Sequence, residues 1–222
     1  MLYEVMQTAV PPVAKLLWRP TVVGVHHVPR TGPLIVASNH LSFADSMVIP
    51  FVVPRKVVFL AKSDYFTGTG LKGLASRVWF EGMGMLPVDR DDTKAALASL
   101  DIALGVLGRG EAFGIYPEGT RSRDGRLYRG RTGVAHLALT AGVPVVPVGL
   151  TGTERLQPVG SKRPRVVDVS VEFGAPLDFT GRFEGVPSGR ARREATDEIM
   201  AAIAGLTGQV EAGVYNERPA DA

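Results

Sequence analysis

Short β-branched runs alternate with helical segments along most of the sequence. The predicted strands are residues 21–26, 33–38, 57–61, 85–88, 112–116, 144–150 and 166–173. The predicted helices are residues 46–53, 71–80, 93–107, 133–141 and 190–206. Each strand and helix must bury its apolar face against another layer, so few arrangements accommodate this order. It predicts an α/β fold with a mostly parallel or mixed central sheet of about seven strands, covered by helices on both faces.

The length of 222 residues fits one domain and is short for two. We assign residues 20–207 to that domain and expect the polar tail, residues 208–222, to be loosely ordered. The absence of cysteine excludes disulfides, thiolate metal sites and a cysteine nucleophile. A formal net charge of +3 is too small to indicate nucleic acid, whereas a membrane surface or an anionic small substrate fits.

Residues 1–19 form an unusual apolar segment at the N-terminus. Leu2, Val5 and later apolar residues follow helical spacing, although Pro11 and Pro12 would kink or divide the helix. Glu4 and the lack of an early basic region argue against a signal peptide. Two interpretations stay open, a helix packed on the protein's own core and an amphipathic helix at a membrane interface. We predict the second.

The string from Ser38 to Asp45 follows a predicted buried strand and places a histidine and an aspartate five residues apart. Inside one helix these two side chains would point about 140° apart, so they meet most easily if His40 precedes the first turn. Asp45 then fixes one imidazole nitrogen and leaves the other as a general base. The alternative is a capping histidine beside an aspartate that faces solvent.

Three further strings lie at the ends of predicted strands. Residues 116–121 combine proline, an acid, glycine, a hydroxyl and a guanidinium, which suits a polar site with a phosphate-binding arginine. Residues 84–90 again end in an arginine, and residues 143–148 are apolar and structural in character. Each string alone is compatible with ordinary surface or core structure.

Together and in this order, the four strings resemble the glycerophospholipid acyltransferase superfamily, specifically the 1-acylglycerol-3-phosphate acyltransferases. Asn39, His40 and Asp45 match its Asn-His-four residues-Asp signature, and residues 116–121 match its Phe-Pro-Glu-Gly-Thr-Arg block with tyrosine in the first place. The resemblance implies that His40 is the catalytic base and Asp45 its orienting partner. The substrate contacts that it implies are Arg90, Glu118, Gly119, Thr120, Arg121, Lys62 and Arg131.

The resemblance also implies the reaction. A long-chain acyl group would pass directly from a thioester, acyl-CoA or acyl-ACP, to the free hydroxyl of lysophosphatidic acid and give phosphatidic acid. We expect no metal and no cofactor other than this co-substrate. The partners would be the lysophospholipid acceptor, the acyl thioester and a membrane surface, with the enzyme peripheral on the cytoplasmic face of the cell membrane.

Rival functions rest on weaker features. Residues 68–73 satisfy Gly-x-Gly-x-x-Gly, but they do not follow a strand directly, as a dinucleotide fingerprint should. A noncatalytic membrane-binding module would explain residues 1–19 but not the spacing of His40 and Asp45. Another lysophospholipid or a glycolipid is the alternative acceptor.

Overall fold

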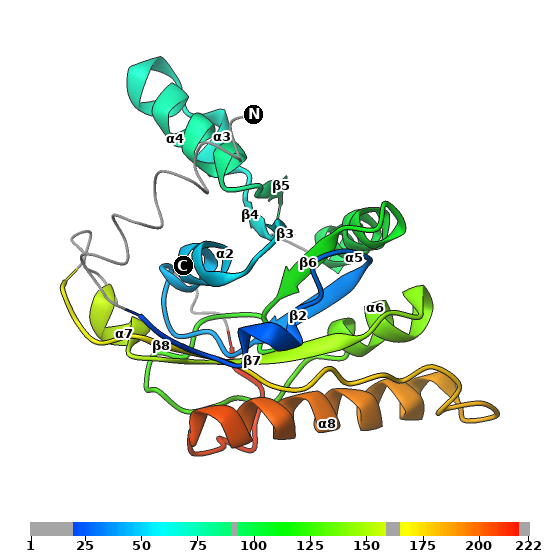
Figure 1. Cartoon of the computed structure of the whole chain (residues 1–222). Helices are drawn as coiled ribbons and strands as arrows, with labels where there is room; N and C mark the ends of the chain where they lie inside the picture. The colour runs from blue at the N-terminus through cyan, green and yellow to red at the C-terminus, as the bar shows by residue number, and fades with distance from the viewer. Residues whose placement is uncertain (1–19, 90–92, 159–164, 218–222) are drawn as a thin grey trace.

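A computed structural model describes residues 20–89, 93–158 and 165–217 of the chain, whose strands form a main sheet and a smaller one. The six strands of the main sheet lie in the order β1, β8, β7, β2, β6, β3 (Figure 1). Neighbouring strands are parallel except β7 and β8. The bounds are β1 Thr21–Val23, β2 Leu34–Ser38, β3 Val57–Val58, β6 Ala112–Ile115, β7 Val145–Thr151 and β8 Ser170–Phe173. The predicted α/β class with a mostly parallel sheet is confirmed.

Helices cover both faces of this sheet, as predicted. On one face lie α5 (Thr93–Gly108), α6 (Gly133–Ala141) and α8 (Ser188–Thr207), and on the other lies α2 (Asp45–Val52) (Figure 1). Successive side chains of a strand point to opposite faces. In β2, Ile35 and Ala37 therefore join the core under α5, α6 and α8, while Leu34 and Val36 join the core under α2.

A second, two-stranded sheet stands beside the main one. It pairs β4 (Leu60–Lys62) with β5 (Leu86–Val88) in parallel, and the chain between them forms α3 (Asp64–Thr67) and α4 (Gly70–Gly82). The single strand predicted for residues 57–61 is wrong, because the chain changes sheets at Phe59. The Phe59 ring lies over Gly114 of β6, where an added Cβ would come within 2.2 Å of it.

The remaining elements differ from the prediction mainly at their ends. All five predicted helices are present to within two residues at each end. The strand predicted from residue 21 ends at Val23 and is followed by a 3-10 helix, η1 (Val25–His27). The strand predicted for residues 166–173 begins only at Ser170. The short helices α3 and α7 (Thr153–Leu156) were not predicted, because four residues are too few for a periodic pattern.

The C-terminal segment, residues 209–217, packs along the loop that follows β6. Backbone hydrogen bonds join Leu127 to Val210 and Ala212, and Arg129 to Val214. These hydrogen bonds connect the predicted tail to a loop about 85 positions earlier in the chain. Residues 218–222 and the predicted membrane-interface segment, residues 1–19, lie outside the described residues. Among the described helices, none is long and apolar enough to cross a membrane.

Candidate active site

Asn39 fixes the start of the site at the carboxyl end of β2. Its Nδ2 donates hydrogen bonds to the backbone oxygen of Leu150 (2.9 Å) and to Oε1 of Gln209 (2.8 Å), and its Oδ1 accepts one from the Leu150 amide (2.8 Å). The side chain is fully buried. It ties the loop after β2 to β7 and to the C-terminal segment, so the next residue, His40, leaves the sheet in a defined direction.

His40 and Asp45 form the predicted pair. Asp45 is the first residue of α2 and is fully buried. Its Oδ2 accepts hydrogen bonds from the amides of Leu41 (2.7 Å) and Ser42 (2.8 Å) and from Nδ1 of His40 (2.9 Å). An ionised carboxylate only accepts, so Nδ1 carries a proton, and in the neutral imidazole the lone pair is then on Nε2. His40 thus precedes the first turn of α2, which is the arrangement that the spacing favoured.

The Tyr116 ring packs against the face of the His40 imidazole. The two rings are stacked, with centroids 3.8 Å apart and planes 9° apart. The Tyr116 hydroxyl lies 2.8 Å from Oγ of Ser46, the second residue of α2. The tyrosine that replaces the usual phenylalanine of the motif therefore connects the strand β6 to the helix that carries Asp45.

Glu118 contacts the backbone of His40, and it does not line either of the two cavities that adjoin His40. It is fully buried; Oε1 accepts a hydrogen bond from the His40 amide (2.9 Å) and Oε2 one from the Tyr128 amide (3.0 Å). Burial raises the pKa of this carboxyl from 4.5 to about 7, the two amides oppose the shift, and the charges of Asp45 and Asp124 add to it. Glu118 thus anchors the backbone at His40 and Tyr128, and its predicted contact with the acceptor stays a prediction.

Two cavities meet at His40. The larger, about 460 Å³, runs between the sheet and helices α5 and α6. The smaller, about 210 Å³, lies toward α3 and α4. Both are bounded by His40, Leu60, Tyr116, Gly119 and Thr120.

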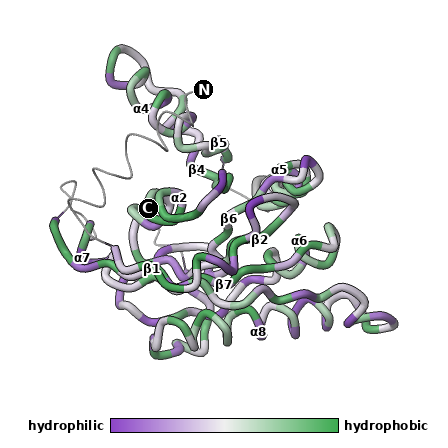
Figure 2. Tube along the Cα trace, viewed as in Figure 1, coloured by the Kyte–Doolittle hydropathy of each residue, from purple (hydrophilic) through white to green (hydrophobic). Residues whose placement is uncertain are grey.

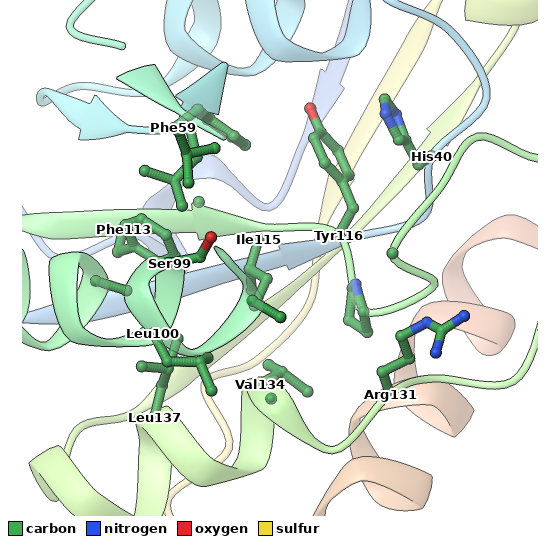
Figure 3. Close-up of a pocket in the computed structure, with 18 of the residues that line it drawn as sticks. His40, Phe59, Ser99, Leu100, Phe113, Ile115, Tyr116, Arg131, Val134 and Leu137 are labelled. Carbon is green, nitrogen blue, oxygen red and sulfur yellow. The ribbon is translucent and has the colours of Figure 1, made fainter. Parts of the chain in front are cut away.

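The two cavities differ in chemistry. The interior of the larger one is apolar and includes Phe113, Ile115, Val134 and Leu137, whereas His40 and Arg131 lie at its polar end (Figure 3). The smaller one contains two cationic side chains, Lys62 and Arg121, together with aromatic residues. His40 thus lies between an apolar cavity and a cationic one.

The other predicted site residues within the described part of the chain line one or both cavities, each in different surroundings. Gly119 has a positive φ of 79°, and an added Cβ would come within 2.9 Å of Nε of Arg131. Lys62 makes an ion pair with Asp64 (2.9 Å) beside the smaller cavity. Arg131 lies at the larger cavity rather than with Lys62 and Arg121. Arg90 lies outside the described residues.

The C-terminal segment supplies residues that the sequence did not predict. Asn216 lines the larger cavity, and its Nδ2 donates to the backbone oxygen of Arg121 (3.1 Å). The Gln209 side chain joins Asn39 to the backbone oxygen of Gly125. Neither residue stands in a motif, so only their placement in three dimensions connects them with the site.

The glycine-rich string at residues 68–73 covers the two-residue turn between α3 and α4 and the first four residues of α4. Gly68 and Gly73 touch there, since a Cβ on Gly73 would come within 1.9 Å of the Gly68 oxygen. The string follows a helix instead of a strand. The dinucleotide-binding alternative therefore lacks its structural context.

Comparison with known proteins assigns this arrangement to a family. The family model described as Acyltransferase matches residues 19–151. The chain belongs to the acyltransferase family. A 1-acyl-sn-glycerol-3-phosphate acyltransferase of Cocos nucifera is 31% identical over 151 residues, which are 64% of this chain and 45% of the relative. The corresponding alpha enzyme of Mus musculus is 35% identical over 138 residues, 61% of this chain and 47% of that one.

A solved structure is similar in fold over most of this chain. The crystal structure of the 1-acyl-sn-glycerophosphate acyltransferase PlsC from Thermotoga maritima has a TM-score of 0.69 and 25% sequence identity, covering 92% of this chain and 78% of that one. The chain spans about half the length of the curated relatives it matches. The predicted family and its fold are thus confirmed.

Proposed function

We propose that the chain transfers a long-chain acyl group from a thioester donor to the free hydroxyl of lysophosphatidic acid, giving phosphatidic acid. The observation that carries the proposal is the His40–Asp45 pair at the junction of an apolar and a cationic cavity. The names of the relatives support the same acceptor. The donor is a carrier thioester, and we propose no metal and no further cofactor.

The chemistry follows from the free nitrogen of His40. Nε2 removes the proton from the acceptor hydroxyl as its oxygen attacks the thioester carbonyl carbon. The tetrahedral intermediate then breaks its C–S bond, and the departing thiolate takes the proton from the imidazolium. Asp45 holds the imidazole in the tautomer that leaves Nε2 free and stabilises its protonated form. No acyl-enzyme is needed, because both substrates are held on opposite sides of one base.

Each of the two cavities would bind a different substrate. An acyl chain is apolar and belongs in the larger cavity, whose interior excludes charge. The acceptor phosphate belongs in the smaller cavity, where Arg121 offers a bidentate fork and Lys62 a point charge. Orientation of the two reactants about His40 then supplies part of the rate enhancement.

We further propose that the chain works on a membrane surface. Three side chains at helical spacing on α4 are exposed although apolar, namely Leu71 (86%), Leu74 (57%) and Val78 (43%). The exposed Lys72 and Arg77 lie on the same helix and suit anionic lipid. Helix α4 projects from the main sheet (Figure 2). Phe80, near its C-terminal end, lines the smaller cavity. A lipid acceptor would thus pass from the bilayer to the base without crossing water.

A donor-by-acceptor activity panel tests the proposal. Folded protein, lipid vesicles, acyl-CoA and acyl-ACP are combined with lysophosphatidic acid, other lysophospholipids and a glycolipid, and His40→Ala serves as the background. We expect transfer to lysophosphatidic acid that the His40→Ala variant lacks. Preference for another acceptor would correct the substrate, and inactivity with every pair would favour a noncatalytic membrane-binding module.

A further inference from the structure

Two arginines, Arg129 and Arg131, share one aromatic ring, and the second of them lines the larger cavity. The guanidinium carbon of Arg129 lies 5.2 Å, and that of Arg131 5.7 Å, from the centre of the Tyr215 ring. The Tyr215 hydroxyl is held by Nη1 of Arg193 (3.2 Å), and Nη2 of Arg131 donates to the backbone oxygen of Asn216 (3.2 Å). The C-terminal segment thus fixes both cationic groups in place.

Arg129 and Arg131 differ from other arginines of this surface in their lack of a carboxylate partner within ion-pair distance among the described residues. Elsewhere on the surface, arginines pair with carboxylates, as in Arg126–Asp124 (2.7 Å) and Arg182–Glu198 (2.7 Å). In the part of the chain that the structure describes, neither Arg129 nor Arg131 makes such an ion pair. Two like charges held beside one ring repel each other, and a bound anion would relieve that repulsion.

A helix N-terminus adds to the same potential. Helix α6 begins at Gly133, two residues after Arg131, and its N-cap residue Thr132 makes no side-chain capping bond. Gly133 and Val134 both line the larger cavity. The positive end of the helix dipole therefore lies at the cavity wall next to Arg131.

The location of Arg131 relative to His40 indicates which substrate this arginine faces. Arg131 and His40 lie at the polar end of the larger cavity, away from Phe113 and Leu137 in its interior (Figure 3). With the acyl chain inside and its carbonyl at His40, the carrier on the other side of the sulfur must leave by that polar end. The acceptor phosphate already has Lys62 and Arg121 in the smaller cavity.

We propose that Arg129, Arg131 and Tyr215 form a second anion site, which binds the phosphate of the donor's phosphopantetheine carrier. The inference rests on the proposed function for the identity of the donor. It assigns Arg131 to the donor instead of the acceptor. Coenzyme A and acyl carrier protein both carry this phosphate, so the site serves either donor.

Direct binding tests the site without turnover. Calorimetry compares 4′-phosphopantetheine with pantetheine, which differ by one phosphate, on wild type and on Arg129→Gln/Arg131→Gln. Wild type is expected to bind the phosphate-bearing probe more tightly, and the double variant to lose about 10- to 100-fold in affinity for it. Affinity for pantetheine is expected to stay the same. The matched control is Arg182→Gln, which removes a guanidinium stacked on Phe179 and Phe183 far along the sequence.

Steady-state kinetics then locates the effect. The double variant should raise KM for acyl-CoA or acyl-ACP while KM for lysophosphatidic acid and for acyl-pantetheine stays within a factor of about two. The carrier whose KM rises identifies the source of the phosphate. A rise confined to the acceptor, equal losses with both probes, or no preference of wild type for the phosphate would overturn the inference. Binding of 4′-phosphopantetheine without acyl transfer would instead refute the proposed function alone.

Discussion

Replacing Glu118 with glutamine should remove a pH-dependent cost to stability. The carboxyl is buried, and its pKa rises from 4.5 in the unfolded chain to about 7 in the fold. A carboxyl with a raised pKa favours the folded state when protonated, so its contribution is complete below pH 4.5 and is lost as the pH rises through 7. Between pH 5 and pH 8 the loss amounts to about 2.5 kcal/mol.

The Glu118→Gln variant lacks this pH-dependent cost to stability, but it also loses a hydrogen bond. Its amide oxygen can accept from only one of the His40 and Tyr128 amides, and its NH2 group faces the other donor. That loss costs about 1–3 kcal/mol at every pH. Glu118→Gln should therefore be less stable than wild type at pH 5, and a change of about 2.5 kcal/mol in its favour should make it more stable than wild type at pH 8.

Urea unfolding followed by circular dichroism at pH 5 and pH 8 measures this change. Glu184→Gln, at an exposed carboxyl, is the matched control and should follow wild type at both values. If the free energies of unfolding of wild type and Glu118→Gln differ by the same amount at both pH values, the carboxyl is not held at a raised pKa. The positioning argument also predicts a lower kcat for this variant, because the His40 backbone loses one of its anchors.

Asp45→Asn should lower kcat on the order of 100-fold while the acceptor KM changes little, because the imidazole loses control of its tautomer; stopped-time assays of acyl transfer measure it. Arg121→Ala should lose about 10- to 100-fold more kcat/KM for a phosphate-bearing acceptor than for a neutral analogue, and equal losses would indicate a structural role. Leu71→Ser should reduce flotation with anionic vesicles, whereas Leu97→Ser, at an exposed leucine on α5, should not. Deletion of residues 2–17 should also reduce flotation and activity on bilayer substrate, with activity on a short-chain soluble acceptor retained.

The sequence by itself determined what depends on neighbours along the chain. The pairing of His40 with Asp45 spans five residues, so the strand before it and the helix after it leave one geometry in which the side chains meet. Helix α6 has the predicted bounds, Gly133–Ala141, because Gly142 ends its apolar pattern. The alternation of elements likewise gave the fold class, since layers must bury their apolar faces.

Only the tertiary structure decided what depends on residues far apart. The Glu118 side chain accepts a hydrogen bond from the His40 amide across 78 positions, a contact that no local pattern indicates. Gln209 reaches Asn39 across 170 positions, and the tail that carries it has no apolar periodicity to predict its order. Phe59 divides a run of strand residues because Gly114 of another strand leaves room for its ring. Such contacts depend on the packing of separate elements, and no local propensity encodes which distant backbone groups will meet.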